Sequence, residues 1–270
     1  MEQEAFIALK DQVCVITGGG GVLGTSMARG LAKAGVITVI LDINEEAAMK
    51  LASEISSELG VRSYGYMCNV LDRASLEEVR LQILNEVGEI DMLINGAGGN
   101  APTATTKLEQ ITEEDLDQLD QGFFGLELEG FQKVFDLNFT GTLLPSMVFT
   151  RDMVARQKGV VLNLSSMNAY KPLTKIPAYS AAKASVNNFT EWLAVHFAKV
   201  GVRVNAIAPG FFLTNQNRFL VTDEKTGALT PRGEKIISNT PMGVLEMIFS
   251  PRGVSLPDFS SISKILNPRT

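Results

Sequence analysis

Tyr179 and Lys183 are the two residues of this sequence whose types and spacing best suit proton-transfer chemistry. They stand four residues apart in a helical pattern, so both side chains project from one face of the predicted helix. A phenol can give a proton to a carbonyl oxygen, but with a pKa of about 10 it is a poor base in the reverse direction. A lysine ammonium one turn away stabilises the phenolate, so we expect Lys183 to move the pKa of Tyr179 toward the working pH. A Tyr and a Lys four residues apart are common on helix surfaces. Other motifs in the chain must therefore show whether this pair is catalytic.

A run of glycines, Thr17-Gly-Gly-Gly-Gly-Val-Leu-Gly24, follows the first predicted strand and opens the first predicted helix. A diphosphate needs N–H donors at close range; glycines permit the approach, and the helix N-terminus supplies donors and a favourable dipole. In this position the run predicts a dinucleotide-binding loop. The expected contacts come from Gly18, Gly20, Gly21, Leu23 and Gly24.

Asp42 ends the second predicted strand. A carboxylate there can accept hydrogen bonds from both hydroxyls of an adenosine ribose and would repel a 2′-phosphate. Neither Ile43 nor Gly21 offers a cation to hold that phosphate. NAD is therefore the expected cofactor and NADP is less favoured; the alternative for Asp42 is a solvated or helix-capping side chain.

Short β-branched runs alternate with longer helical patterns along the chain. The predicted strands are residues 13–17, 36–41, 62–67, 92–95, 159–164 and 202–208. The predicted helices are residues 22–34, 45–59, 74–87, 139–157 and 178–200. Because parallel strands need crossover helices, this order predicts an α/β fold with a doubly wound parallel sheet (Rossmann fold) in a single domain. Two irregular stretches, 110–130 and 211–241, should lie at the carboxyl ends of strands, where ligands bind.

The composition argues against several classes of protein. A formal net charge of −6 and scattered Lys and Arg residues disfavour binding to nucleic acid or to a membrane surface. Cys14 and Cys68 lie in apolar runs and are expected to be buried thiols, and His196, the single histidine, cannot complete a zinc site with them. The acidic N-terminus lacks the features of a secretion signal, and no apolar run approaches the ~20 residues of a membrane span. We expect a cytoplasmic protein without a metal, acting on a small molecule.

Further motifs surround the Tyr–Lys pair in a fixed order. They are Asn95-Gly-Ala-Gly98, Asn138, Ser166 and Pro209-Gly210-x-x-x-Thr214. Together with the glycine loop, these motifs resemble the short-chain dehydrogenase/reductase family from Val13 to about Gly243. The resemblance implies an NAD-dependent enzyme that acts on CH–OH donors and interconverts a secondary alcohol and a ketone.

The resemblance also implies a role for each matching residue. Tyr179 would be the acid/base, Lys183 would also bind the nicotinamide ribose, Ser166 would orient the substrate oxygen, and Asn138 would hold a water in the proton relay. The cofactor-binding positions that it implies are Asn69, Val70, Asn95, Ala97, Gly98, Tyr179, Lys183, Pro209, Gly210 and Thr214. Asn95 and Gly98 correspond to the turn over the adenosine ribose. Asn69 stands where the family usually has Asp, and Val22 replaces a common family glycine.

Three stretches, 98–105, 130–138 and 214–218, resemble the D-mannonate oxidoreductase (fructuronate reductase) branch. A sugar acid is anionic and rich in hydroxyls, so its site needs a cation and several amides. The candidates are Asn100, Asn168, Asn215, Gln216 and Arg218, with Arg218 expected to pair with the substrate carboxylate. Two alternatives stay open: another small ketone, such as a gluconate-type sugar acid or a 3-oxoacyl thioester, or a catalytically impaired dinucleotide-binding paralogue.

The chain departs from the family pattern after Gly243, which divides it into an oxidoreductase domain, 1–243, and an atypical C-terminal segment, 244–270. The family's last helix and strand are not recognisable there, and a shifted reading frame is one explanation. Without that strand a sheet edge would be unpaired, and one of the family's usual subunit interfaces would be missing. Family members also pair through the helices at 139–157 and 178–200, so we expect a homodimer of marginal stability rather than a tetramer.

Overall fold

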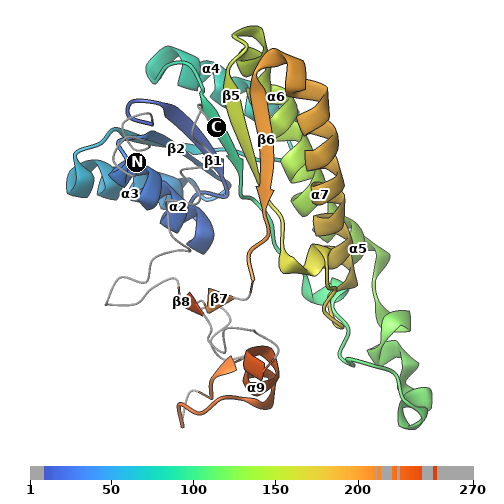
Figure 1. Cartoon of the computed structure of the whole chain (residues 1–270). Helices are drawn as coiled ribbons and strands as arrows, with labels where there is room; N and C mark the ends of the chain where they lie inside the picture. The colour runs from blue at the N-terminus through green and yellow to red at the C-terminus, as the bar shows by residue number, and fades with distance from the viewer. Residues whose placement is uncertain (1–8, 211, 214–220, 224–225, 239–245, 248–270) are drawn as a thin grey trace.

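The computed structural model describes residues 9–210, 212–213, 221–223, 226–238 and 246–247. One sheet of six parallel strands, in the order β3-β2-β1-β4-β5-β6, forms the centre of the molecule (Figure 1). Its strands are β1 (Val13–Thr17), β2 (Ile37–Asp42), β3 (Ser63–Met67), β4 (Met92–Asn95), β5 (Gly159–Leu164) and β6 (Val202–Ile207). The strand order reverses direction between β1 and β4, which confirms the predicted doubly wound Rossmann fold.

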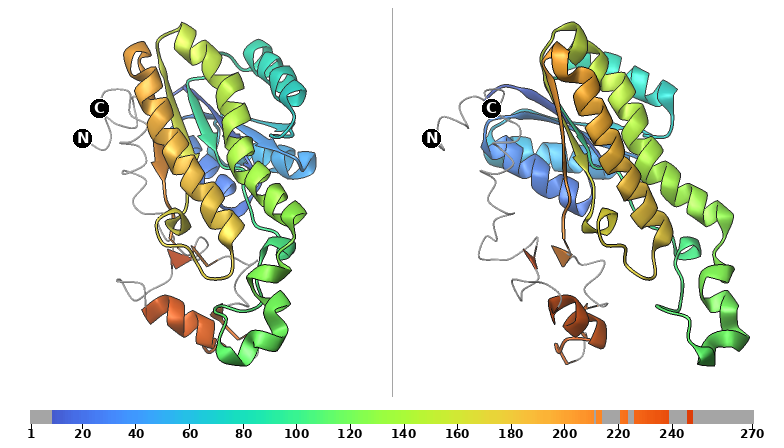
Figure 2. Two further views of the ribbon diagram at one scale, coloured as in Figure 1. Left: turned by 90° about the vertical axis from the view of Figure 1, so that its right-hand side faces the viewer. Right: turned by 45° about the vertical axis from the view of Figure 1, so that its right-hand side comes forward.

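Helices cover both faces of this sheet (Figures 1 and 2). The long helices are α2 (Val22–Lys33), α3 (Glu45–Leu59), α4 (Arg73–Glu86), α6 (Gly141–Ala155) and α7 (Pro177–Phe197). Helices α2 and α3 pack on one face with Ile16 and Ile40, and α4, α6 and α7 pack on the other with Val15 and Val39. Successive side chains of a strand point to opposite faces, so burial on both faces explains the continuous apolar runs of β1 and β2.

The predicted strands and long helices agree with the structure to within three residues at each end, and the largest difference is at α7, which ends at Phe197 rather than at residue 200. Directly before α6, residues Asp136–Thr140 form a π-helix, η4. A π-helix places an extra residue in one helical turn and is frequent at functional sites. Two helices were not predicted: α5 (Leu128–Phe135), which leads into η4, and α9 (Pro231–Ser238).

The arm, defined here as residues 99–127, leaves the body of the molecule between β4 and α5 (Figure 1). It contains three short 3-10 helices: η1 (Pro102–Ala104), η2 (Glu113–Gln121) and η3 (Phe123–Gly125). The sequence pattern predicts an irregular segment over 110–130 because η2 consists mostly of acidic and amide residues, which show no apolar periodicity. Gly130 weakens the helix signal of α5, yet packing requires it: a Cβ there would lie 2.2 Å from Thr103 Oγ1.

The C-terminal segment 244–270 lies outside the described residues apart from Glu246–Met247. These two residues form β8, which pairs in parallel with β7 (Phe212–Leu213). In the part of the chain that the structure describes, β6 pairs with β5 and with no other strand. Cys14 and Cys68 are buried free thiols, as predicted. No described helix has the length and apolar character needed to cross a membrane.

A string of buried polar side chains links the centre of the sheet to α6 and α7. Asn95 Nδ2 donates to Ser146 Oγ at 2.9 Å and to Asn163 Oδ1 at 2.8 Å. Asn163 Nδ2 donates in turn to Thr190 Oγ1 at 2.8 Å. All four residues are buried, and a buried polar group that loses its water needs such partners. The string therefore sets β4 and β5 in place relative to the two helices.

Replacing Asn163 by Leu should lower the free energy of unfolding by about 2–3 kcal/mol, because Asn95 Nδ2 loses an acceptor and Thr190 Oγ1 loses its donor. Urea denaturation followed by circular dichroism measures the loss. Thr150→Val is the matched control: Thr150 is also buried, but its hydroxyl donates to the Ser146 carbonyl of the same helix. Its loss should cost less than about 1 kcal/mol. Equal losses in both variants would show that the string adds no stability of its own.

Candidate active site

The loop between β1 and α2 is shaped by backbone contacts that leave no room for side chains. Gly18 has φ +62°, and a Cβ there would lie 2.8 Å from Ala97 Cα in the turn after β4. A Cβ at Gly24 would lie 2.4 Å from the Gly18 carbonyl oxygen, so the first turn of α2 packs directly on the loop. No side chain caps α2 at Gly21, so its first N–H groups favour an anion. These residues suit the diphosphate of a dinucleotide.

Asp42 supports the same loop from the end of β2. Its Oδ2 accepts a hydrogen bond from the Gly20 N–H and its Oδ1 accepts one from the Asn44 N–H, both at 3.0 Å. Asn44 is the N-cap of α3, so the helix-capping alternative for Asp42 holds in part. A carboxylate has capacity for further hydrogen bonds, and Asp42 can combine this structural role with binding of ribose hydroxyls.

Two residues at the turn after β4 face different parts of the protein: Asn95 faces the core, and Gly98 faces the reactive side chains. Asn95 is buried on Ser146 and Asn163, so the predicted contact with the adenosine ribose cannot come from its side chain. Gly98 lies on the other side: a Cβ there would be 2.6 Å from Asn138 Oδ1 and 3.2 Å from Lys183 Nζ. Only glycine lets the backbone of this turn approach both side chains.

Asn69 and Val70 follow β3 at the same end of the sheet. Asn69 Oδ1 accepts a hydrogen bond from the Leu71 N–H at 3.0 Å, which leaves the exposed side-chain NH₂ as the donor toward an adenine. Val70 is buried against the start of α6, where a Cβ at Gly141 would lie 3.1 Å from Val70 Cγ2. The predicted cofactor contacts of both residues stay predictions.

Asn138 is fully buried in η4 and clamps the start of the arm. Its Nδ2 donates to the carbonyl of Gly99 at 2.6 Å and to that of Val134 at 2.8 Å, and its Oδ1 accepts from the Gly99 N–H at 3.2 Å. Its own carbonyl oxygen accepts from Thr142 Oγ1 at 2.9 Å. The water-holding role predicted for Asn138 stays a prediction; the structure adds that its side chain fixes Gly99.

Ser166 and Tyr179 come together from β5 and α7. Ser166 follows the end of β5, where it caps the 3-10 helix η5 (Met167–Ala169), and its Oγ accepts from the Asn168 N–H at 3.2 Å. The Tyr179 phenol lies close enough to the Ser166 side chain for this hydroxyl to lower the pKa of the phenol. Tyr179 lies in the first turn of α7 and packs against a small apolar cluster of Ala104, Val134 and Ala178. A hydroxyl and a phenol thus lie together where a carbonyl oxygen can meet both.

Lys183 is buried one turn further along α7. Its Nζ donates to the Leu164 carbonyl at the end of β5 at 2.7 Å and lies 5.7 Å from the centre of the Tyr179 ring. Burial lowers the pKa of Lys183 to about 8. A buried cation needs hydrogen-bond acceptors, and the Leu164 carbonyl is a backbone acceptor that no side-chain pattern reveals.

The expected fall in the pKa of Tyr179 is wrong for the protein without a bound cofactor. Burial of the phenol raises its pKa, and the nearby Ser166 side chain opposes this rise only in part. Desolvation penalises the phenolate, while the Lys183 ammonium donates to the Leu164 carbonyl rather than to the phenol oxygen. Spacing along α7 correctly put the two residues on one face but could not show this balance.

The remaining predicted residues divide into described and undescribed positions. Asn168 is buried beside Ser166, whereas Asn100 is exposed and its Nδ2 donates to Thr105 Oγ1 at 2.8 Å. The Pro209 carbonyl accepts from the Met167 N–H at 3.0 Å, which places the Pro209-Gly210 segment beside the residue that follows Ser166. Four predicted contacts lie outside the described residues: Thr214, Asn215, Gln216 and Arg218.

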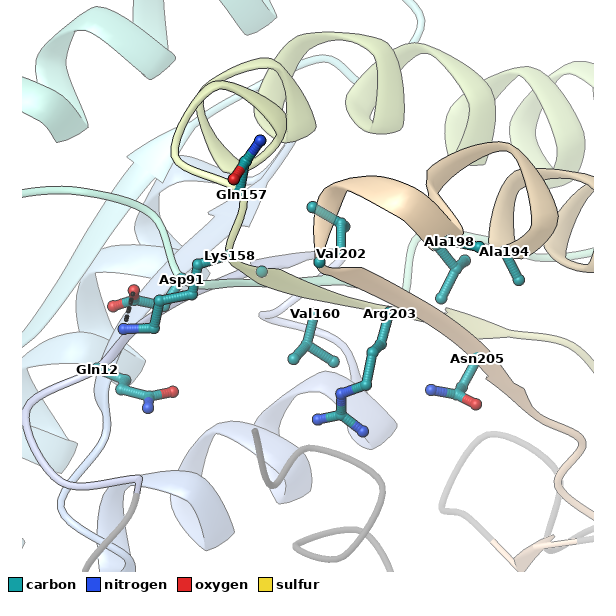
Figure 3. Close-up of a pocket in the computed structure, with 13 residues that line it drawn as sticks. Gln12, Asp91, Gln157, Lys158, Val160, Ala194, Ala198, Val202, Arg203 and Asn205 are labelled. Atoms are coloured by element: carbon teal, nitrogen blue, oxygen red, sulfur yellow. Dashed lines mark ion pairs between the residues drawn. The ribbon is translucent and has the colours of Figure 1, made fainter. Parts of the chain in front are cut away.

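A cavity of about 730 Å³ lies at the opposite end of the sheet from these residues (Figure 3). Its lining includes Asp91, Val160 and Val202, near the amino ends of β4, β5 and β6, with Arg203 beside them. None of the predicted site residues lines it. In parallel α/β sheets ligands bind at the carboxyl ends of strands, so size alone does not mark this cavity as the active site.

Lys183 gives the site a pH dependence that stability measurements can detect. Its pKa is about 8 in the folded protein against 10.5 as the ordinary value, so the unfolded chain binds more protons between these two pH values. Stability therefore rises with pH through this window, and the cost of burying the ammonium is fully present below it.

Comparing wild type with Lys183→Met by urea denaturation should show this trend. From about pH 7.5 to 10, the difference in unfolding free energy should move in favour of wild type by roughly 2–3 kcal/mol. Lys50→Met, at an exposed position of α3, is the control for general effects of pH. A difference for Lys183→Met that does not change with pH would show that this lysine is uncharged throughout or not desolvated.

Known proteins with this arrangement identify the family. A model of short-chain dehydrogenases matches residues 12–225. An uncharacterized oxidoreductase of Haemophilus influenzae is 50% identical over 235 residues, which cover 87% of this chain and 81% of the relative. The uncharacterized oxidoreductase UxuB of Bacillus subtilis is 49% identical over 234 residues, which cover 87% and 82%. A solved Haemophilus structure, provisionally assigned as a D-mannonate oxidoreductase with bound NAD, has a TM-score of 0.84 at 48% identity, covering 90% of this chain and 87% of that one. The chain belongs to the short-chain dehydrogenase/reductase family of oxidoreductases.

Proposed function

We propose that this enzyme interconverts a sugar acid and its keto form, of the D-mannonate and D-fructuronate type, with NAD as cofactor. The observation that carries the proposal is the meeting of Ser166, Tyr179 and buried Lys183 beside a glycine loop that suits a diphosphate. The Haemophilus structure described as a D-mannonate oxidoreductase supports the choice of substrate and cofactor.

A bound nicotinamide would supply the hydride that reduces the carbonyl carbon. Tyr179 gives its phenolic proton to the carbonyl oxygen, and Ser166 orients that oxygen by donating a hydrogen bond. Lys183 holds positive charge beside the developing phenolate and lowers its cost. Asn138, through its hydrogen bonds to Gly99, fixes the start of the arm, which brings Ala104 to the apolar cluster on which Tyr179 packs. In the oxidation the Tyr179 phenolate takes the hydroxyl proton back.

Turnover assays with NADH or NAD and a panel of substrates test the substrate class. D-fructuronate should be reduced faster than a 3-oxoacyl thioester or 5-keto-D-gluconate, and D-mannonate should be oxidised. Fastest turnover of one of the other ketones would favour the alternative of another small-ketone reductase. Tight NADH binding with no turnover of any member would favour a dinucleotide-binding paralogue without catalysis.

Tyr179→Phe should abolish turnover, by at least about 10³-fold in kcat, because it removes the group that transfers the proton. Its affinity for NADH should stay within about twofold of wild type. Lys183→Ala should weaken both turnover and cofactor affinity, because its ammonium lies beside Gly98 and Tyr179. Steady-state kinetics and fluorescence titration with NADH measure the two effects. Near-normal kcat in Tyr179→Phe would reject the assigned mechanism.

The enzyme should bind NADH about tenfold or more tightly than NADPH, because Asp42 repels a 2′-phosphate. Asp42→Ser should narrow that ratio, and paired titrations with the two cofactors measure it. Asp72→Ser is the control: Asp72 also caps a helix with its carboxylate but lies at the start of α4, and its loss should leave the ratio as in wild type. Equal affinity of wild type for both cofactors would contradict the assignment of NAD.

We also propose a homodimer through the outer face of α7. Trp192 and Val195 are 57% and 79% exposed there. Trp192 stacks on His196 with ring centres 4.7 Å apart and, with Phe139 and Phe189, lines a shallow hollow. A second copy would remove this apolar surface from water. Trp192→Glu should shift the protein to monomer in light scattering, whereas Leu81→Glu, at an exposed apolar position of α4, should leave the mass unchanged. A wild-type monomer would contradict the proposal.

A further inference from the structure

An ion pair joins the arm to α9 at the lower end of the molecule in Figures 1 and 2. Lys235 Nζ of α9 lies 2.7 Å from Glu109 Oε2 of the arm. The arm contributes Ala104 to the apolar cluster on which Tyr179 packs. Glu109 therefore lies further along the arm than Ala104, facing a helix from the other end of the sequence.

Two more cations lie around Glu109. Lys175 stands four residues before Tyr179, and its carbonyl accepts a hydrogen bond from the Thr106 N–H of the arm at 2.9 Å. Arg232 stands three residues before Lys235, so the two share a face of α9. All three cations lower the pKa of the Glu109 carboxyl, with Lys235 the main cause. Lys175 and Arg232 are half-buried and, among the described residues, form no ion pair.

The cation cluster, defined here as Lys175, Arg232 and Lys235, is positively charged in an otherwise acidic part of the protein. The chain has a net charge of −6, and the arm just beyond Glu109 is acidic. Its acidic residues are Glu113, Glu114, Asp115, Asp117 and Asp120. Three cations facing one carboxylate therefore form a local excess of positive charge next to the helix that carries Tyr179. Such an arrangement suits a second carboxylate.

We propose that Lys175, Arg232 and Lys235 bind the carboxylate of the substrate, and that Glu109 occupies this position in the free enzyme as an internal substitute. The inference deepens the proposed function, since it rests on an anionic substrate at the same site. Glu109 and Lys235 have side chains that are 42% and 65% exposed, and an ion pair this exposed contributes little to stability. A substrate carboxylate can exchange for it without disturbing the fold.

The Glu109–Lys235 ion pair has two possible roles: competition with the substrate, or attachment of α9 to the arm. Neutralising Glu109 should change substrate binding in opposite directions under these two roles. If Glu109 competes with the substrate, Glu109→Gln removes the competing carboxylate and strengthens binding of a substrate carboxylate. If the pair only fastens α9 to the arm, the same variant loosens the site for charged and neutral substrates alike. Lys235→Gln and Arg232→Gln remove binding groups and should weaken the carboxylate substrate selectively.

The experiment compares kcat/KM for D-fructuronate with kcat/KM for D-fructose, its neutral counterpart. Their ratio should rise about fivefold in Glu109→Gln and fall about fivefold in Arg232→Gln and in Lys235→Gln. Glu113→Gln is the matched control, since it removes the same charge from the same arm outside the cluster and should leave the ratio as in wild type. A ratio in Glu109→Gln that falls, or that rises no more than in Glu113→Gln, would overturn the proposal.

A binding measurement separates this inference from the proposed reaction. Titration of the NADH complex with D-gluconate and with neutral D-glucitol, followed by calorimetry, does not depend on turnover. Tighter binding of gluconate alone in Glu109→Gln would support the carboxylate site even if wild type reduced no sugar acid, in which case the proposed function would fail by itself. Equal changes for gluconate and glucitol would overturn the inference and leave the proposed function standing.

Discussion

A lysine ammonium buried where α7, β5 and the turn after β4 meet is the constraint on which the rest of the site depends. Lys183 loses its water there and keeps one strong backbone acceptor, the Leu164 carbonyl at 2.7 Å. An isolated charge in such a place is unfavourable, so the surrounding backbone has to stay close and fixed. Gly98 meets this requirement because a side chain at its position would collide with Asn138 and crowd Lys183.

Several interactions far from Lys183 also hold the backbone of the site in place. Asn138 grips Gly99 with both ends of its amide, and the string from Ser146 through Asn95 and Asn163 to Thr190 ties the strands to the helices behind them. These groups do not react, yet each one holds the backbone that presents a reactive group. The chemistry of the site is local, whereas its support extends through two strands and two helices.

The proposed substrate end is built differently from the cofactor end. The glycine loop, Asp42 and the turn after β4 are connected by backbone contacts and short hydrogen bonds, which suit a cofactor of constant shape. The arm and α9 are joined through long, exposed side chains such as Glu109 and Lys235. Long exposed side chains can change partners at small cost, which suits a site that admits and releases a substrate.

The sequence by itself determined the strands, the long helices, the glycine loop and the placing of Tyr179 and Lys183 on one helix face. These features depend on local periodicity, on residues without a Cβ and on spacing within one helix, all of which can be read along the chain. The family also follows from the order of such motifs. The helices α5 and α9 were not predicted because each has only eight residues with a glycine among them, which is too short a pattern to stand out along the chain.

Only the tertiary structure decided what depends on burial and on contacts between distant residues. It placed the Asn95 side chain in the core, gave Asn138 its grip on Gly99, and made desolvation rather than Lys183 the main influence on the pKa of Tyr179 in the free protein. It also brought Glu109 to Lys235 across 126 positions of the sequence. Desolvation and charge pairing are set by three-dimensional neighbours, and a neighbour 126 residues away leaves no trace in local sequence.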